Sequence, residues 1–397
     1  MKPLTRPGVL LLAFALSCCA TPDPTPKREE WFELRGGLAR SAAVFERTRH
    51  GRVAFLGGSI TFNPGWREQV CDYLRQRFPD TEFEFLAAGI PSTGSTPGAF
   101  RLARDVLGNG TVDLLFEEAA VNDSTNGRTD LEQVRAMEGI VRHARRHNPD
   151  LDLVLLHFVD PDKMRIYRQG KVPAVIRNHE RVAAHYALPS LDLAREVTDR
   201  IDRGEFTWRD DFRDLHPSPF GQRIYSRAIC RMLEAAWAHA EPRPRPTIEP
   251  LDPFCYDRGQ LLPPTAVTTL ADFEVQERWR NEVGGSTRAG FVDVPMLVGT
   301  RPGASFTFAF AGRAVGLFVA AGPDAGVIEY RVDDGPWRER DLFTRWSRGL
   351  HLPWLYVLAA ELPGDRRHLL EVRIADRHDP ASKGHACRIA QFAVNGS

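Results

Sequence analysis

The stretch Val53-Ala54-Phe55-Leu56-Gly57-Gly58-Ser59-Ile60-Thr61 decides the fold of this chain. A short apolar run ends in two glycines and a serine, and residues 65–78 continue as an amphipathic segment. This pattern predicts a buried strand, a tight turn and a helix. The Ser59 hydroxyl would then lie uncovered at the carboxyl end of the strand, where open α/β sheets bind ligands. Thr61 occupies the second glycine position of a Gly-x-Ser-x-Gly elbow, which disfavours an α/β-hydrolase turn. Taken alone, the motif indicates a structural turn serine.

Strand-like and helix-like patterns alternate from this stretch to about residue 240 of the 397-residue chain. Such alternation predicts a mostly parallel sheet with helices on both faces, a three-layer α/β domain over residues 27–240. The helix expected at 129–147 opens with a capping box, Thr129 and Glu132, and the last helix opens with a proline. The expected strands are 53–56, 83–87, 112–116, 153–158 and 190–193, and the expected helices are 65–78, 97–107, 129–147, 173–187 and 219–240.

The composition changes beyond this domain. Residues 241–265 are crowded with prolines, which predicts a linker or a wrapped connection. Farther on, alternating phenylalanines at 306–310 predict a half-buried strand, and residues 333–335 predict a hairpin turn. The sequence therefore predicts a smaller all-β domain, a sandwich or jelly roll, over residues 266–397.

The first 26 residues resemble a bacterial lipoprotein signal followed by a short tether. Basic residues precede an apolar run at 9–16 that is too short to span a bilayer. Either Cys18 or Cys19 would carry the lipid, and ordinary secretion is the alternative. We expect export to the cell envelope, in the periplasm or at the outer membrane, or secretion, with membrane contact only through the lipid anchor.

Charge and cysteine content exclude several classes of function. The 52 basic and 52 acidic residues balance, so no broad field favours nucleic acid or an anionic membrane. Beyond the signal, the cysteines show neither Cys-x-x-Cys nor zinc spacing. We expect Cys71 to be a buried free thiol, whereas Cys230 and Cys255 could form a disulfide in an oxidising compartment.

Three later residues make Ser59 a candidate nucleophile. Gly89 and Asn122 follow two expected strands, at the same sheet edge as Ser59, and His216 stands near the end of the α/β domain. Serine becomes nucleophilic when a base such as histidine takes its proton. The tetrahedral intermediate then needs donors around its oxyanion. The N–H groups of Ser59 and Gly89 and the side chain of Asn122 would supply three.

These stretches resemble, in order and spacing, the sequence blocks of the SGNH (GDSL-like) hydrolase superfamily. The first block is Gly57-Gly58-Ser59-Ile60-Thr61, the second is Gly89, the third is Asn122-Asp123, and the last surrounds His216. The resemblance covers about residues 52–240. It implies a flavodoxin-like three-layer fold and ester hydrolysis without metal or organic cofactor. It also implies that Ser59 is the nucleophile and His216 the base.

The family pairs its catalytic histidine with an aspartate, and together with the serine these form a catalytic triad. The position of this aspartate is where the chain departs from the family pattern. An Asp-x-x-His block would place aspartate three residues before His216, and the chain has Arg213 there. We favour Asp214 as the acid over Asp211 or a backbone carbonyl. Because the acid only orients the base and stabilises its charged form, a weaker substitute would slow catalysis without abolishing it.

Three further acidic residues lie beside these blocks. Glu117 and Glu118 fall in or next to a strand core, and we expect them to meet a polar partner such as an arginine. Asp123 follows Asn122 directly, and we expect it to order its loop. None of the three is predicted to react.

The sequence therefore favours an exported serine esterase that removes O-acetyl groups from carbohydrate. The substrate class rests on export, on the β domain and on what relatives of such architecture commonly do. Alternatives on the same fold are a lipase or lysophospholipase and an acyltransferase. A catalytically decayed carbohydrate-binding lipoprotein also remains, and the departure at Arg213 favours it. Aromatic residues of the β domain could stack on sugar rings or simply pack: Trp337, Trp346 and Trp354, with His351 nearby.

Overall fold

The computed structural model describes residues 31–238, 245 and 247–396, and the chain from Trp31 onward forms one compact unit. The predicted signal and tether, with Cys18 and Cys19, lie outside the described residues. Within the described ranges, no helix is both long enough and apolar enough to cross a membrane.

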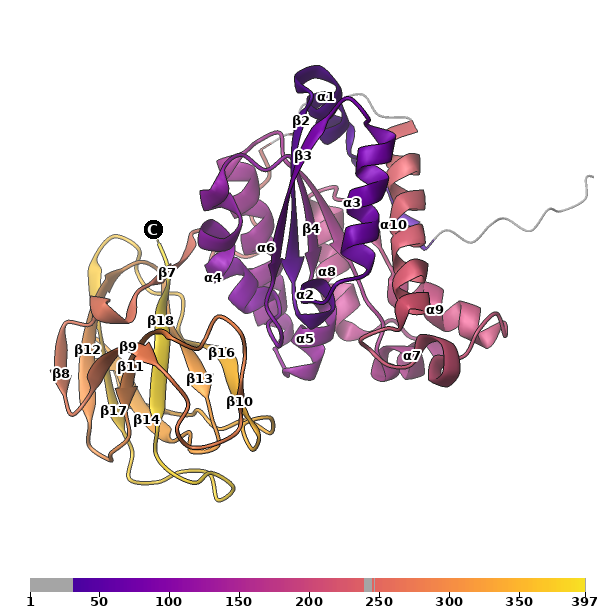
Figure 1. Cartoon of the computed structure of the whole chain (residues 1–397). Helices are drawn as coiled ribbons and strands as arrows, with labels where there is room; N and C mark the ends of the chain where they lie inside the picture. Colours follow the sequence, from indigo (N-terminus) through magenta and orange to yellow (C-terminus); the bar gives the residue numbers. More distant parts are fainter. Residues whose placement is uncertain (1–30, 239–244, 246, 397) are drawn as a thin grey trace, which may run out of the picture. The chain divides into compact units, whose positions relative to one another are not determined.

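A six-stranded sheet forms the centre of the α/β part, which runs from β1 to α10 (Figure 1). Its strand order is β1-β6-β5-β4-β2-β3; β2 to β6 run parallel and the short β1 pairs antiparallel with β6. This confirms the predicted parallel α/β sheet. The strands are β1 (Phe32–Glu33), β2 (His50–Gly57), β3 (Glu82–Gly89), β4 (Leu114–Glu118), β5 (Asp152–Leu156) and β6 (Ser190–Leu191).

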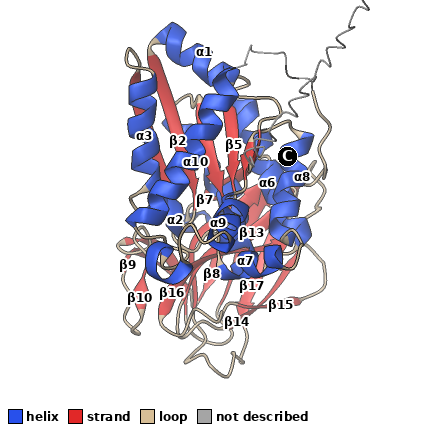
Figure 2. Ribbon diagram, turned by 90° about the vertical axis from the view of Figure 1, so that its right-hand side faces the viewer, coloured by secondary structure: helices blue, strands red, loops and turns tan. Residues whose placement is uncertain are grey.

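Helices cover both faces of this sheet and bury two separate apolar clusters (Figures 1 and 2). One face carries α1 (Ala39–Thr48), α3 (Trp66–Arg77), α9 (Leu193–Asp202) and α10 (Pro219–Ala238). The other carries α4 (Ser95–Asp105), α6 (Asp130–His147) and the second half of α8 (Ala174–His185). Shorter helical segments are α2 (Ser59–Phe62), η1 (Leu107–Asn109), α5 (Ala120–Thr125), α7 (Pro161–Arg168) and η2 (Trp208–Phe212).

Two helix starts agree with the sequence signals. Thr129 caps α6: its hydroxyl accepts the N–H of Glu132, and the Glu132 carboxylate accepts the N–H of Thr129. The first residue of α10 is Pro219. Both patterns act locally, through backbone groups within one helical turn, so they can be recognised without tertiary information.

The β part, from β7 to β18, consists of two sheets that enclose an apolar core. The seven-stranded sheet has the order β10-β16-β13-β18-β11-β9 with β7 on β18, and the five-stranded sheet has the order β15-β14-β17-β12-β8. The expected inward alternation of phenylalanines occurs on β12. The strands are β7 (Gly259–Leu262), β8 (Thr269–Ala271), β9 (Glu274–Trp279), β10 (Ser286–Thr287), β11 (Val294–Gly299), β12 (Ser305–Ala311), β13 (Ala314–Ala321), β14 (Val327–Val332), β15 (Arg338–Asp341), β16 (Leu350–Ala359), β17 (Arg367–Ile374) and β18 (Cys387–Asn395).

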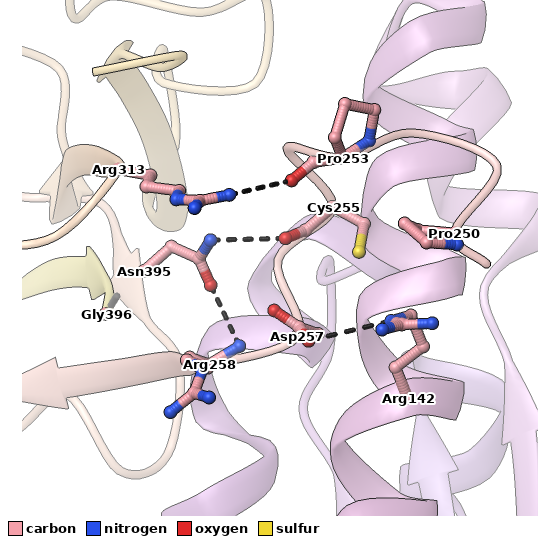
Figure 3. Close-up of a pocket in the computed structure, with 9 residues that line it drawn as sticks. All are labelled: Arg142, Pro250, Pro253, Cys255, Asp257, Arg258, Arg313, Asn395 and Gly396. Atoms are coloured by element: carbon pink, nitrogen blue, oxygen red, sulfur yellow. Dashed lines mark hydrogen bonds and ion pairs between the residues drawn. The ribbon is translucent and has the colours of Figure 1, made fainter. Parts of the chain in front are cut away.

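The proline-rich connection is held in place by side chains from both parts (Figure 3). The Asn395 side chain donates to the carbonyl of Cys255 and accepts the N–H of Arg258. On the other side, Arg142 of α6 forms an ion pair with Asp257 at 3.6 Å. These residues line a pocket of about 280 Å³ that contains none of the predicted site residues. The connection is therefore a wrapped one, and β7, which the sequence placed in the linker, already pairs with β18.

One apolar cluster joins the two parts. Side chains of α4 and α6 share it with Trp279, Phe318 and Leu355 of the seven-stranded sheet. The two helices thus pack against the parallel sheet on one side and against the β part on the other.

The four described cysteines, Cys71, Cys230, Cys255 and Cys387, are all free. The disulfide considered between Cys230 and Cys255 is absent from this structure. Burial raises the pKa of each of the four thiols to about 12, so they remain protonated near neutral pH.

Candidate active site

Ser59 is the first residue of the short helix α2, directly after the carboxyl end of β2. The two preceding glycines allow this turn to approach its neighbours closely. A Cβ at Gly57 would lie 2.4 Å from Oγ1 of Thr61, and one at Gly58 would lie 2.1 Å from Oδ1 of Asn122. Any larger residue would therefore push the nucleophile turn away from Asn122. In Figure 1, α2 and α5 lie together at the carboxyl edge of the sheet.

His216 reaches Ser59 from the segment between η2 and α10. Its Nε2 lies 2.7 Å from the Ser59 hydroxyl oxygen, the distance of a hydrogen bond. The two residues are 157 positions apart, and the fold brings them together as the nucleophile and base of a hydrolase require. Ser59 is half-buried and the imidazole is 45% exposed, so the pair is open to substrate.

Asp214 is the favoured acid, and the structure places it beside the imidazole but not in hydrogen-bond contact with it. Its Oδ1 lies 3.7 Å from Nδ1 of His216. The same oxygen accepts the backbone N–H of His216 at 2.6 Å. The carboxylate is therefore engaged by the main chain of the residue it would orient.

Asp211, the alternative acid, is occupied elsewhere. Its carboxylate accepts the N–H of Thr207 at 2.8 Å and the Thr207 hydroxyl at 3.1 Å, and so stabilises the helical turn η2. Arg213, at the position of the family's acid, is exposed and has a φ of 83°. This conformation is unfavourable for a non-glycine residue, and it separates η2 from the loop that carries His216.

The structure gives Gly89 a role different from the predicted oxyanion donor. Gly89 is the last residue of β3, paired with Gly57, and a Cβ there would lie 2.5 Å from the backbone nitrogen of Phe62. The glycine thus allows α2 to pack on β3. Because Ile90 donates its N–H to Gly57 and N–H groups alternate along an extended strand, the N–H of Gly89 points away from β2.

Gly94 lies next to the turn that carries Ser59, and the sequence analysis did not single it out. It occupies the N-cap position of α4, and the carbonyl of the preceding Thr93 lies against Gly58. The first N–H groups of a helix have no partner within the helix. The sequence held one sign of it, a second glycine after Gly89 in the loop between β3 and α4. It was not used, because the helix that follows was expected to begin only at residue 97.

A buried carboxylate lies behind the nucleophile. Glu118 accepts the N–H of Gly58 at 3.3 Å and the hydroxyl of Thr61 at 3.4 Å. Glu118 therefore has the expected polar partners, but they are a backbone N–H and a hydroxyl and not an arginine. Burial raises the pKa of Glu118 to about 7. Burial, together with the nearby Glu118 and Asp123, also raises the pKa of Glu117 well above its ordinary value.

Arg101, fully buried on α4, holds the ends of β2 and β3. Its guanidinium donates to the carbonyl of Gly57 at 3.0 Å and to the carbonyl of Ala88 at 2.7 Å, and pairs with Asp105 at 3.0 Å. The C=O and N–H of a trans peptide point in opposite directions. By fixing these carbonyls, Arg101 fixes the orientation of the peptide that leads into Gly58.

Loops of the β part contact the same edge of the α/β part. Arg345 donates to the carbonyl of Thr125 in α5 at 2.6 Å. The adjacent Trp346 is 45% exposed and lies under the Arg345 guanidinium at 4.5 Å. Arg128, which follows α5, stacks over Trp354 at 5.0 Å. Trp346 is therefore partly exposed in a loop that contacts α5 through Arg345, whereas Trp354 is used in packing.

The other two candidate sugar contacts of the β part differ in exposure. Trp337 is 38% exposed on the β14–β15 hairpin, with the guanidinium groups of Arg331 and Arg373 over its ring at 4.9 and 4.3 Å. His351 is fully buried beside Trp279. His351 is thus a core residue in this structure.

The α/β part is a three-layer fold, and a serine and a histidine are in contact at the carboxyl edge of its sheet. This is the arrangement of a serine hydrolase. Residues 55–224 match the model of the GDSL-like Lipase/Acylhydrolase family. The resemblance seen in the sequence is confirmed over this range: residues 55–224 match the GDSL-like family model, and a β-rich part follows them.

Solved structures extend the likeness to both parts of the chain. A two-domain esterase (CEX) active on acetylated mannans, co-crystallized with mannopentaose, is 22% identical, with a TM-score of 0.75 over 94% of this chain and 98% of the other. A second structure of a two-domain esterase (CEX) active on acetylated mannans is 21% identical, with a TM-score of 0.76 over 94% and 99% of the two chains. At this identity the likeness shows the two-domain fold. No curated protein matches the sequence of this chain.

Proposed function

We propose that this protein is a serine esterase that removes O-acetyl groups from carbohydrate. The observation that carries the proposal is the 2.7 Å contact between the Ser59 hydroxyl and His216 Nε2 in a GDSL-like hydrolase domain. A hydroxyl hydrogen-bonded to an imidazole can lose its proton as it attacks an ester carbonyl.

The reaction proceeds in two steps. Ser59 Oγ attacks the carbonyl carbon while its proton passes to His216 Nε2, and the tetrahedral intermediate collapses as the sugar oxygen leaves with that proton. Water then attacks the acyl-enzyme, giving up a proton to His216. Acetate leaves and Ser59 recovers its proton. Asp214 stabilises the charged imidazole from 3.7 Å.

Three donors stabilise the oxyanion in this proposal: the N–H of Ser59, the N–H of Gly94 and the side-chain amide of Asn122. Ser59 begins α2, Gly94 caps α4, and the Asn122 amide lies against Gly58. Gly94 replaces Gly89 because the N–H of Gly89 points away from the strand that leads to Ser59. Donors fixed before the reaction lower the barrier more than donors that must reorganise.

The carbohydrate substrate is supported by the two-domain likeness and by exposed aromatic side chains near the site. The structural neighbours with TM-scores of 0.75 and 0.76 are esterases active on acetylated mannans. Phe62, at the end of α2, and Trp346 are each 45% exposed. Aromatic faces of this kind can stack on pyranose rings. An acetylated mannan is therefore the first substrate to test.

Export with an N-terminal lipid on Cys18 or Cys19 is part of the same proposal. It rests on the basic and apolar pattern of the first residues. A polysaccharide substrate is met outside the cytoplasm, which fits such a signal. Metabolic labelling with a fatty-acid analogue, compared between the wild type and the Cys18→Ala and Cys19→Ala variants, tests it; absence of label from the wild type would reject the anchor.

The decisive experiment measures acetate release by the protein without its first 26 residues. An aryl acetate, acetylated mannan and acetylated xylan serve as substrates, and Ser59→Ala is the matched variant. We expect release by the wild type, loss in Ser59→Ala, and preference for one polysaccharide. Preference for long-chain aryl esters would instead indicate a lipase, and acetyl transfer to a sugar would indicate an acyltransferase. No release by folded wild-type protein would reject the esterase.

A further inference from the structure

Asp123 is a fully buried carboxylate next to Asn122, and the mechanism above makes no use of it. Three donors meet it. Its Oδ1 accepts the backbone N–H of Ser95 at 2.9 Å, and its Oδ2 accepts the Ser95 hydroxyl at 2.5 Å and lies 3.0 Å from Nε2 of His179. So many partners for one buried side chain require several chain segments to be held in register.

The segments that Asp123 joins are the ones that carry two oxyanion donors. Asp123 follows Asn122 within α5, and Ser95 follows Gly94 at the start of α4. A Cβ at Gly94 would lie only 2.1 Å from Oδ1 of Asp123, so the carboxylate packs directly on that glycine. Asp123 therefore sets the separation between the Asn122 amide and the Gly94 N–H.

His179 of α8 supports this carboxylate from the other side. The imidazole is fully buried, and burial lowers its pKa although the hydrogen bond with Asp123 acts in the opposite direction. A neutral imidazole with its proton on Nε2 donates one hydrogen bond to Oδ2. The His179 ring thus limits rotation of the Asp123 side chain about its axis.

We infer that Asp123, oriented by His179, is a positioning residue for the oxyanion site. It touches neither substrate nor reacting atoms. It acts by holding α5 and the N-terminus of α4 at the spacing that lets Asn122 and Gly94 donate to one oxygen. This inference rests on the proposed esterase function.

The expected signature is a fall in kcat with little change in KM, because the oxyanion exists only in the transition state and the intermediates near it. Loss of one oxyanion donor costs about 100- to 1000-fold in kcat. We expect Asp123→Ala, which displaces a donor without removing it, to lower kcat about 10- to 100-fold on an aryl acetate. His179→Leu should cost roughly fivefold, and His179→Gln, which keeps an N–H donor, should recover most of that loss.

A double-mutant cycle tests whether Asp123 acts through Asn122. If it does, Asp123→Ala should lower kcat clearly less in the Asn122→Ala background than in the wild type, because only the Gly94 donor is then left to displace. Asp192→Ala is the matched control, because the Asp192 carboxylate accepts the N–H of Arg195 at the start of α9 and the hydroxyl of Tyr167 in α7, and neither partner belongs to α4 or α5. The control should keep its kcat within about twofold. Losses that multiply in the double variant would overturn the inference.

Amide hydrogen exchange supplies a readout that does not depend on turnover. In Asp123→Ala, peptides covering residues 93–97 and 119–127 should lose protection together, while peptides of β12 and β13 should not change. Unchanged exchange in both segments would overturn the positioning role even if the protein hydrolyses no ester. Conversely, wild-type turnover that disappears in Ser59→Ala but persists undiminished in Asp123→Ala would leave the esterase standing and remove the inference.

Discussion

The Asp214 carboxylate accepts the backbone N–H of His216 at 2.6 Å and stays 3.7 Å from Nδ1 of the same residue. The main-chain bond fixes the carboxylate near the imidazole but directs its oxygen away from the ring nitrogen. The side chain is also 68% exposed, so water screens its charge. An acid held in this way orients the base only weakly.

We therefore expect Asp214→Ala to lower kcat/KM on an aryl acetate by only about tenfold, against about 10⁴-fold for a triad acid in direct contact. Asp211→Ala is the matched control. It removes the bonds to Thr207, so it should cost about 1 kcal/mol of stability and leave the activity per folded molecule unchanged. Steady-state kinetics and urea unfolding of both variants measure this. A larger loss of activity in Asp211→Ala than in Asp214→Ala would assign the acid to Asp211.

Arg101 provides a second prediction, because it is the buried support of the nucleophile turn. Arg101→Met removes the guanidinium that donates to the carbonyls of Gly57 and Ala88 and that pairs with Asp105, and Gly57 keeps only the N–H of Ile90. Breaking a buried pair from one side costs about 3–5 kcal/mol, which urea unfolding measures.

Arg104→Met is the comparison for Arg101. Arg104 bonds the same Asp105 at 2.5 Å, but its side chain is 44% exposed. An exposed pair contributes about 1 kcal/mol or less. Equal destabilisation by the two variants would show that Arg101 stabilises the protein through its pair with Asp105 and not through its bonds to the ends of β2 and β3.

Local patterns were enough to predict five of the six strands of the parallel sheet and the helices α3, α4, α6, α8 and α10, but not β1, α1 or α9. Residues 53–57 of β2 and 114–116 of β4 are apolar and buried, and α6 has its capping box within the sequence. The shorter helices α2 and α5 have four and six residues. Segments of this length have little helical stability of their own, and tertiary contacts such as that between Asn122 and Gly58 hold them.

The start of α4 shows why Gly94 was missed. The helix begins two residues before the expected Pro97 because Asp123, 28 positions away, accepts the N–H of Ser95. A cap supplied from another helix leaves no signal in the local sequence. Ser59, Asn122 and His216, in contrast, stand next to expected strand ends or family-like blocks, which is why they could be predicted.

Glu118 gives the third prediction, on stability against pH. Burial raises its pKa from 4.5 to about 7, so the folded state binds the proton more tightly than the unfolded chain. Protonation of Glu118 therefore stabilises the folded state, fully below pH 4.5 and no longer once the pH has risen through about 7. By linkage, the free energy of unfolding falls by about 3 kcal/mol over this interval. Glu118→Gln cannot titrate and keeps an oxygen for the N–H of Gly58.

Urea unfolding between pH 4.5 and 8 tests this difference. The wild type should lose about 3 kcal/mol relative to Glu118→Gln across that interval. Glu46→Gln, an exposed substitution on α1, should give a curve parallel to the wild type. Parallel curves for the wild type and Glu118→Gln would mean that Glu118 keeps one protonation state throughout.

The last prediction concerns Trp346. Replacing it should weaken binding of the polymer without changing the chemical step at Ser59. The exposed ring lies next to Arg345, which is bonded to Thr125 in the helix that carries Asn122. A sugar stacked on such a face gains about 0.5–1.5 kcal/mol, so Trp346→Ala should lower kcat/KM on acetylated mannan by about three- to tenfold. An aryl acetate is too small to reach from Ser59 to Trp346, so its kcat/KM should fall much less. Trp337→Ala removes a comparably exposed ring from the other sheet and should alter neither rate. Equal losses on polymer and aryl acetate in Trp346→Ala would mean that this loop supports α5 and does not bind sugar.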